Sequence, residues 1–439
     1  MLDKIILKIE KIVPEKWRWI LNHEGFKRYF ANTGWMFLGQ FFYLGVSFFV
    51  GAWIARYLGP NKYGLVSYVV AFAGLFGFIG SLGVDGILHR ELVSHPEKRD
   101  ELLGTSFRLK IIGSGIAFFI AAIFAFTFNG FYSLTSWLII MFSVSFFFQA
   151  PNVITTFFYS QVKARENIKA QIIAAIISAT LKVGLIILGG GIVWLLIIYI
   201  LDYIWQAIFL VRLYNFQGFK ILAWKFKPEL AKSLWRDSWP LMLSSVASFV
   251  YLRIDQVMVG KIMGDTAVGI YAASVKITEV FYFLPMIICG SLFPAIVNAR
   301  NTDFKAYYRR LKNLYGLVGS LGFLVALPIA LLAGPIIGFV FGAQYLAAIP
   351  ILQIYTWSSI GLFLGVVVNN QLMAENRTRA VFIINFVAMV VNIVLNILLI
   401  PRLGLIGAAL ATLVAYSIAP IWMLFLRRRA PVVEVKGEN

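Results

Sequence analysis

The stretch Tyr251-Leu-Arg-Ile-Asp-Gln256 places an arginine and an aspartate inside an otherwise apolar run from Ser238 to Met258. Roughly 20 apolar residues are enough for a helix to cross the hydrocarbon core of a bilayer. A charge at the bilayer centre costs about 2.5 to 3.5 kcal/mol on insertion scales, so such a residue normally faces a bundle interior or a water-filled cavity. The stretch therefore predicts a membrane helix that carries function.

The rest of the chain has the composition of an integral membrane protein. Of the 439 residues, 60% are hydrophobic and 13% are charged, and the mean hydropathy is +0.82, well above that of ordinary soluble proteins. Twelve apolar runs are long enough to span a bilayer, at residues 33–57, 64–88, 104–128, 134–159, 168–188, 192–213, 237–260, 267–296, 312–334, 349–373, 379–400 and 404–426. We therefore expect an all-α polytopic membrane protein with about 12 transmembrane helices.

The basic residues predict the topology. The chain has 39 Lys and Arg against 20 acids, and the loops on one side of the predicted membrane hold only four of the basic residues: Arg56, Lys62, Lys261 and Arg402. By the positive-inside rule, both termini are cytoplasmic and the protein is a multi-pass protein of the cell (inner) membrane. The basic excess also suits anionic lipid headgroups, and we expect no nucleic acid partner.

Cysteine and histidine give no basis for a metal or a cofactor. Cys289 is the single cysteine, so no disulfide can form within the chain. His23, His89 and His95 lack the spacing of metal ligands. We therefore expect no metal site and no cofactor.

A weak internal repeat divides the chain. Leu58-Gly-Pro-Asn-Lys-Tyr-Gly64 follows the first apolar run, and Met263-Gly-Asp-Thr-Ala-Val-Gly269 follows the seventh, 205 residues later. Ala164-Arg-Glu-Asn167 and Met373-Ala-Glu-Asn376 recur in the same way before the fifth and eleventh runs. Parallel repeats related by an axis along the membrane normal are typical of transporters, with the substrate path between them, although channels and membrane enzymes can also be duplicated.

The repeat predicts two pseudo-symmetric lobes of six helices each. The first, residues 1–217, also includes an amphipathic helix at the start of the chain, where Ile5, Ile6 and Ile9 recur at helical spacing between charged residues. The second, residues 218–439, begins with a polar linker. We expect the amphipathic helix to lie on the inner membrane surface.

Six ionisable residues lie deep in the predicted spans, three basic and three acidic: Lys182, Asp202, Arg253, Asp255, Lys276 and Glu279. Arg253 and Asp255 are two residues apart on one helix and cannot pair well with each other. Glu279 is placed to pair with Lys276 or with Arg253, and Lys182 is within reach of Asp202. Such residues either form ion pairs that hold the helices together or line a hydrated cavity that receives an anionic group.

Further polar residues extend the candidate path. Arg108 and Lys110 lie about two turns inside the inner end of the third run, so cations occur at several depths from the inner side outward. Asn370 and Gln371 belong to an amide-rich set in the later runs that suits sugar hydroxyls. Polar residues of this kind also join membrane helices to one another.

Several segments around the opening stretch resemble the polysaccharide repeat-unit, or lipid-linked oligosaccharide, flippases of the multidrug/oligosaccharidyl-lipid/polysaccharide exporter superfamily. They are Ser238-Trp-Pro-Leu-Met-Leu-Ser-Ser245, Tyr251-Leu-Arg-Ile-Asp-Gln-Val-Met-Val-Gly260, Gly264-Asp-Thr-Ala-Val-Gly-Ile-Tyr-Ala-Ala273, Ser274-Val-Lys-Ile-Thr-Glu279 and Ser291-Leu-Phe-Pro-Ala295. The resemblance implies a V-shaped pair of lobes that flips a polyprenyl-(pyro)phosphate-linked oligosaccharide from the cytoplasmic to the outer leaflet by alternating access. Such a protein serves cell-surface polysaccharide biosynthesis, for example of the O-antigen of lipopolysaccharide.

The resemblance also gives roles to the polar residues. It implies that cations attract the pyrophosphate and that amides contact the sugars, with Arg253, Lys276, Lys182, Arg108, Lys110, Asn370 and Gln371 as the substrate-binding candidates. Asp255, Glu279 and Asp202 are then counter-charges or sites for a coupling ion, proton or sodium. Membrane lipids and polysaccharide-assembly proteins are the further partners.

Two other classes of function were weighed. The first is an ion-coupled multidrug exporter of the same superfamily, in which acids rather than bases would bind the substrate. The second is a membrane glycosyltransferase or polymerase, which needs catalytic carboxylates or histidines in an outer loop. The longest outer segment, Gly334 to Ile349, has neither, so we expect a transporter and not an enzyme.

Overall fold

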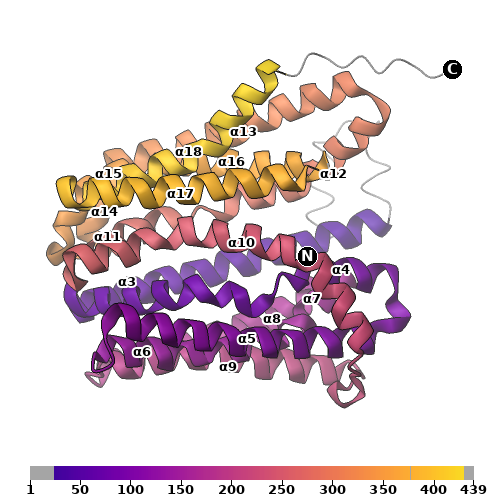
Figure 1. The fold of residues 1–439 in the computed structure, drawn as a ribbon, viewed down its shortest axis with the longest axis horizontal. Helices are drawn as coiled ribbons and strands as arrows, with labels where there is room; N and C mark the ends of the chain where they lie inside the picture. Colours follow the sequence, from indigo (N-terminus) through magenta and orange to yellow (C-terminus); the bar gives the residue numbers. More distant parts are fainter. Residues whose placement is uncertain (1–23, 376, 430–439) are drawn as a thin grey trace. The chain divides into compact units, whose positions relative to one another are not determined.

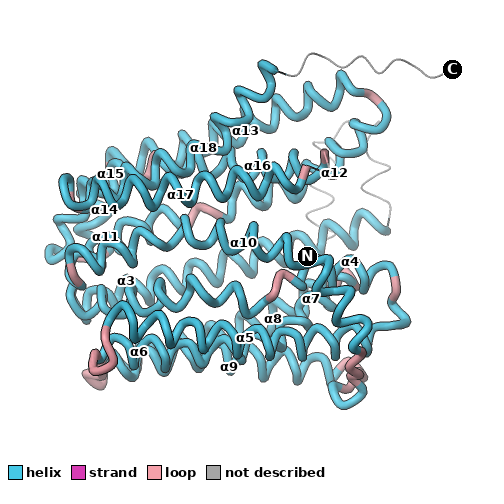
Figure 2. The backbone as a smooth tube through the Cα atoms, in the orientation of Figure 1, coloured by secondary structure: helices cyan, strands magenta, loops and turns pink. Residues whose placement is uncertain are grey.

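The computed structural model describes residues 24–375 and 377–429, which form α-helices joined by short turns (Figure 1). Figure 2 shows helix and turn throughout this part of the chain, with no strand. The all-α fold class is confirmed. The amphipathic helix expected at the start of the chain lies outside the described residues.

The helices follow one another with few long connections. Up to the polar linker they are α3 (Glu24–Ser81), α4 (Val84–Ser94), η1 (Pro96–Lys98), α5 (Arg99–Asn129), α6 (Leu134–Ser143), η2 (Val144–Asn152), α7 (Val153–Ser160), α8 (Ala164–Ile187) and α9 (Ile192–Phe216). From the linker onward they are η3 (Ile221–Ala223), α10 (Pro228–Met263), α11 (Asp265–Glu279), α12 (Phe283–Thr302), α13 (Phe304–Leu331), α14 (Ala333–Val340), η4 (Ala343–Ala348), α15 (Ile349–Tyr355), α16 (Ser358–Ala374), α17 (Thr378–Leu403) and α18 (Leu405–Arg429).

Within the described residues, ten helices are long and apolar enough to cross a membrane, or up to eleven if the bent pair Ala343–Tyr355 and Ser358–Ala374 is one span. The first of them, Gly34–Ser94, contains two of the predicted runs, because two helices meet at a kink inside α3 and α4 follows directly. At that kink Gly59 has a positive φ of 71°, and Pro60 follows it inside the helix. Ten or eleven helices with the length and hydropathy of a span are therefore present in this part of the chain, and the count of twelve stays a prediction.

The chain forms two compact units. Unit 1 comprises residues up to Val50, Ile79–Ile120 and Met141–Trp239. Unit 2 comprises Gly51–Phe78, Ala121–Ile140 and the chain from Pro240 onward. The division into lobes at residues 217 and 218 stays a prediction.

In unit 1, the polar linker after α9 is attached to the first turns of α5. The Lys225 backbone N–H donates to the carbonyl oxygen of Asp100 (3.1 Å), and that of Lys227 donates to Thr105 Oγ1 (3.1 Å). The Lys227 side chain forms a salt bridge of 2.7 Å with Glu101. These bonds fix the position from which α10 begins.

In unit 2, the two copies of the repeated turn lie directly against each other. The Asn61 side chain donates to Thr266 Oγ1 (3.1 Å), a residue 205 positions later. A Cβ added to Gly64 would overlap the carbonyl oxygen of Asp265, and one added to Gly269 would overlap that of Pro60. Because Asp265 and Pro60 are also 205 residues apart, the contact is self-complementary, as at a twofold axis.

A second contact joins α3 to the segment after α14 at the same end of unit 2. The Arg56 guanidinium donates to the carbonyl oxygens of Gly338 (3.2 Å) and Phe339 at the end of α14. In return, the Gln344 amide donates to the carbonyl oxygen of Arg56 (2.7 Å), and the Tyr345 hydroxyl donates to that of Ala55 (2.9 Å). These bonds satisfy backbone carbonyl oxygens that have no partner within their own helix, because the helix bends or ends there.

Candidate functional site

Arg253 on α10 forms an ion pair with Glu279 on α11 inside unit 2. The two helices are joined by a tight turn at Gly264, whose φ is 83°, so that α11 runs back beside α10. Arg253 Nη1 lies 2.9 Å from Glu279 Oε1. The two side chains are 36% and 27% exposed, so the pair is partly accessible at the surface of unit 2. Of the two pairings open to Glu279 from the sequence, this is the one that the structure has.

Lys276 lies beside this pair without an acid in salt-bridge distance among the described residues. It is three residues before Glu279 on α11, and its ammonium group occupies the space that a side chain at Gly51 would fill. Glycine at position 51 therefore makes room for the charge. The half-exposed cluster of Arg253, Lys276 and Glu279 holds two cations and one acid.

Asp255 has a different environment, although it is only two residues from Arg253. Its side chain is 2% exposed, and Oδ2 accepts hydrogen bonds from the Tyr271 hydroxyl (2.6 Å) and from Thr412 Oγ1 (2.8 Å). Oδ1 is buried and has no hydrogen-bond partner among the described residues. Asp255 is thus sealed among neutral groups on α11 and α18, with one oxygen unsatisfied.

In unit 1, Lys182 on α8 and Asp202 on α9 form the other deep ion pair. Lys182 Nζ lies 2.7 Å from Asp202 Oδ2, and the side chains are 13% and 30% exposed. The same ammonium group lies 2.6 Å from Ser178 Oγ and 4.5 Å from the centre of the Tyr199 ring. This pair is balanced and its cation is enclosed.

The two cations predicted nearer the inner side are both engaged within unit 1. Lys110 is buried and forms a salt bridge of 2.5 Å with Asp85. Arg108 is exposed, and its guanidinium lies over the ring of Phe226 in the linker, 5.1 Å from the ring centre. A ligand at either residue stays a prediction.

Of the two predicted amides on α16, Gln371 is buried and bonded at both ends. Its oxygen accepts from the Tyr315 hydroxyl (2.9 Å), and its nitrogen donates to Glu375 Oε1 (2.8 Å). The partly buried Asn370 donates to the carbonyl oxygen of Val366 in the preceding turn (2.8 Å). A sugar contact at these two positions also stays a prediction.

Three residues that complete these sites were not singled out from the sequence. They are Tyr271 and Thr412, which bond Asp255, and Gly51, which faces Lys276. A polar residue in an apolar run is the signal that draws attention to Thr412, but it does not name its partner 157 positions earlier. Among the described residues, no group of three or more His, Cys, Asp or Glu could hold a metal ion.

Two family models match this chain. The model described as polysaccharide biosynthesis protein matches residues 29–300, which is more than half of the chain and includes the charged cluster. The chain belongs to the polysaccharide biosynthesis protein family. A second model, MatE, matches residues 240–398, so the second part of this family member also resembles the multidrug exporters of the superfamily.

Individual proteins agree with this family. The chain is 22% identical, over 87% of its own length and 80% of the relative's, to a probable low-salt glycan biosynthesis flippase, Agl15, of Haloferax volcanii. Its fold is similar to that of a multidrug resistance MATE family transporter in an inward-facing conformation, with a TM-score of 0.71 and 15% identity over 89% of this chain and 94% of the other. It is also similar to the lipid II flippase MurJ in an inward closed conformation, with a TM-score of 0.69 and 19% identity over 92% and 88%. The likenesses to the two solved structures show that the chain shares their fold.

Proposed function

We propose that this protein flips a polyprenyl-(pyro)phosphate-linked oligosaccharide from the cytoplasmic to the outer leaflet for cell-surface polysaccharide biosynthesis. The observation that carries this proposal is the cluster of Arg253, Lys276 and Glu279, which holds one more cation than acids in a half-exposed site within the spans. A lipid-linked glycan brings a (pyro)phosphate to that depth. The name of the Haloferax relative supports a flippase, a transporter rather than an enzyme.

The geometry supports an exchange of partners when phosphate arrives. The planar guanidinium of Arg253 matches phosphate oxygens with two parallel hydrogen bonds, so phosphate competes with Glu279 for it. Glu279 then turns to Lys276, three residues earlier on the same helix face. No charge is left without a counter-charge in the membrane, and release of the phosphate restores the original pair.

Alternating access requires one end of the path to close while the other opens. The contact between the two repeated turns, with Gly64 against Asp265 and Gly269 against Pro60, lies at the end that the positive-inside rule places outside. We propose that this contact closes the outer end and separates when the glycan leaves. Its self-complementary form suits repeats that move against each other.

Asp255 is our proposed site for a coupling cation. A buried carboxylate with one unsatisfied oxygen, bonded by Tyr271 and Thr412, gains most from taking up a proton or a sodium ion. Binding of a cation there would change the electrostatic environment of Arg253, two residues away on the same helix. The deep acids Asp202 and Glu279 then serve as counter-charges to Lys182 and Arg253.

The remaining assignments follow from this function. Arg108 and Lys110 are further candidates to guide the phosphate, and Asn370 and Gln371 are candidates to contact the glycan. Lys182, whose charge Asp202 already balances, is proposed instead to hold α8 against α9. The protein is proposed to work in the cell membrane with both termini in the cytoplasm, beside polysaccharide-assembly proteins.

A second function has a specific observation in its favour. The MatE match and the buried Asp255 both fit an ion-coupled exporter of small cationic compounds, in which an acid binds the substrate. In that case, loss of the protein raises drug susceptibility and leaves the surface glycan intact.

The test of the proposed function is removal of the protein from its host. We expect the lipid-linked oligosaccharide to accumulate on the inner leaflet, and the surface polysaccharide to disappear, until the gene is restored. A panel of cationic drugs measured in the same strain separates the alternative. Normal surface glycan together with increased drug susceptibility would contradict the flippase.

A further inference from the structure

The first turns of α10 carry an exposed face of cations and tryptophans that the proposed transport path does not use. Lys232, Trp235, Arg236 and Trp239 follow one another at intervals of three, one and three residues, which places them on one side of the helix. The two tryptophans are 41% and 46% exposed. We call these four residues the basic tryptophan face.

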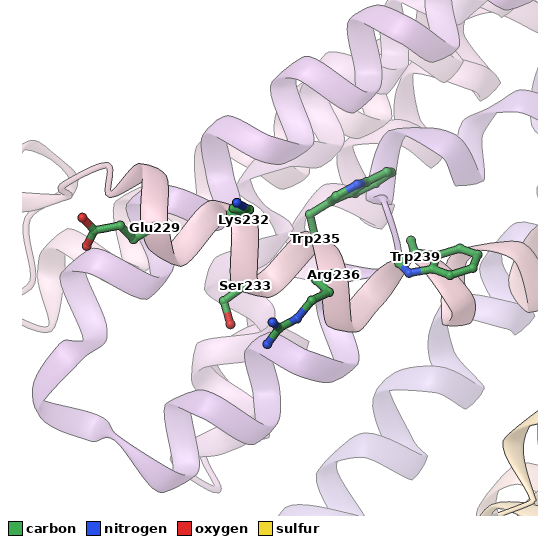
Figure 3. Close-up of a pocket in the computed structure, with 6 residues that line it drawn as sticks. All are labelled: Glu229, Lys232, Ser233, Trp235, Arg236 and Trp239. Atoms are coloured by element: carbon green, nitrogen blue, oxygen red, sulfur yellow. The ribbon is translucent and has the colours of Figure 1, made fainter.

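These residues line a hollow on the surface of unit 1. Figure 3 shows the six side chains around it, all carried by one helix: Glu229, Lys232, Ser233, Trp235, Arg236 and Trp239. The hollow has a volume of about 430 Å³. It has room for a small charged group.

The face lies at the depth of lipid headgroups. The apolar run within α10 begins at about residue 237, so Trp239 lies just inside its inner end and, at 1.5 Å per residue, Arg236 lies about 2 Å outside it. The headgroup layer is roughly 5 to 8 Å thick on each side of the hydrocarbon. Lys232 lies one turn further out, within a Debye length of about 8 to 10 Å of the lipid phosphates.

The nearby charges leave the face positive. Glu229 is exposed on the same side of the helix, one turn before Lys232. Asp237 is approached by Arg236 Nε at 3.6 Å and by Arg90 at 3.4 Å, and Arg90 also pairs with Glu91 at 2.9 Å. Lys232 has no acid within salt-bridge distance among the described residues. Around the hollow an anion therefore meets two cations, Lys232 and Arg236, and one acid, Glu229.

The face is also held in place. The linker just before it is bonded to α5 through Lys225 and Lys227, so the start of α10 does not need to be ordered when a ligand binds. A preformed site loses less entropy on binding than a mobile one.

We propose that the basic tryptophan face binds the phosphate of an anionic membrane phospholipid in the cytoplasmic leaflet. Lys232 and Arg236 bind the phosphate, and Trp235 and Trp239 pack at the boundary between the headgroups and the acyl chains, where tryptophan is enriched. A phospholipid is the proposed ligand of the face because phospholipids surround this depth of the helix in every state of transport. The proposal does not depend on the cargo.

The test is lipid retention by the full-length protein in detergent, measured by native mass spectrometry with phosphatidylglycerol and with phosphatidylcholine. We expect the wild type to retain phosphatidylglycerol preferentially. Lys232→Gln with Arg236→Gln should weaken that retention about 25-fold, or about fivefold for each cation. High salt should weaken the wild type in the same direction.

The matched control is Lys98→Gln with Arg379→Gln, which removes the same charge from two exposed sites that share no helix face with a tryptophan. This control should retain phosphatidylglycerol like the wild type. Equal loss in both double variants, or equal retention of both lipids by the wild type, overturns the proposal. A third arm uses undecaprenyl pyrophosphate: if the Lys232/Arg236 variant loses only this lipid and keeps phosphatidylglycerol, the face belongs to the cargo and the proposal is also overturned.

Discussion

The two deep ion pairs of this protein have the same charges but different surroundings. In Lys182–Asp202 the cation is 13% exposed and is also contacted by Ser178 and Tyr199. In Arg253–Glu279 the cation is 36% exposed, and Lys276 adds a second cation without an acid of its own.

This difference separates a pair that holds helices together from a pair that can exchange partners. A balanced, enclosed pair has nothing to gain from an anion, because binding one would strand its acid. A pair with an extra cation beside it can accept an anion and remain balanced. We therefore place the function at the pair whose local charge is incomplete.

The largest effect is expected from Arg253→Ala. Without the guanidinium, Glu279 turns to Lys276 on its own helix, so both cations become unavailable to phosphate. Export should fall at least about 100-fold, because more than one charge-assisted hydrogen bond of about 1.5 to 3 kcal/mol is lost. Surface glycan at matched protein levels is the measurement, and wild-type export by this variant would break the comparison.

Lys276→Met should have the next largest effect on export. It leaves the Arg253–Glu279 pair neutral and removes the cation that allows partner exchange, for a loss of about 10-fold or more. The protein should not be destabilised, since no acid is left unpaired. Thermal unfolding of the purified variant tests the expected stability. A large loss of stability would show that Lys276 is structural.

Lys182→Met is the matched change in the balanced pair. It strands Asp202 and should cost about 1 to 3 kcal/mol of stability, after allowance for the exposed fraction of the pair. Export per folded molecule should change only slightly. The double variant Lys182→Met with Asp202→Leu should recover the lost stability, and a loss of export that persists in it would place Lys182 in the substrate path.

Gly51→Ala sharpens the comparison without changing any charge. The added methyl group displaces the Lys276 ammonium, which is the flexible end of a long side chain, so folding should be spared. Export should fall a few-fold in the same assay, less than for Lys276→Met. The effect should vanish when Gly51→Ala is added to Lys276→Met, because the displaced group is already absent.

The smallest effect is expected at Asp303, a carboxylate outside the spans. It caps α13 by accepting from the backbone N–H groups of Lys305 (2.9 Å) and Ala306 (3.0 Å), and these bonds hold the pKa of Asp303 below its ordinary value. Its contribution to stability is therefore present above the ordinary pKa and is lost as the pH falls through the lowered one. Asp303→Ala should lower the midpoint of thermal unfolding slightly at pH 7 and by less as the pH falls below the ordinary pKa of aspartate, with no effect on export.

Helical spacing predicted part of the site and three-dimensional packing decided the rest. The two-residue separation of Arg253 and Asp255 excluded a pair between them, and the unequal surroundings of the two follow from that. The hydroxyls around Asp255 come from α11 and α18, and no local pattern connects those helices. Gly51 lies in α3, more than 200 residues before the lysine that it faces.

The fold was also predictable only in part. Apolar length predicts spans, and ten or eleven are present in the described residues. It does not predict how two consecutive helices are joined, as at Gly59, where non-helical φ and ψ link two helices without an intervening loop. The repeat predicted two related turns, but their contact at Gly64 and Gly269 depends on how their helices pack.

The most direct test of the account is binding of undecaprenyl pyrophosphate to purified wild type, Lys276→Met and Lys182→Met in lipid nanodiscs that contain only zwitterionic lipid. The incomplete cluster predicts that Lys276→Met binds about 10-fold or more weakly, while Lys182→Met binds like the wild type. Equal affinity of wild type and Lys276→Met, or a greater loss in Lys182→Met, would contradict it.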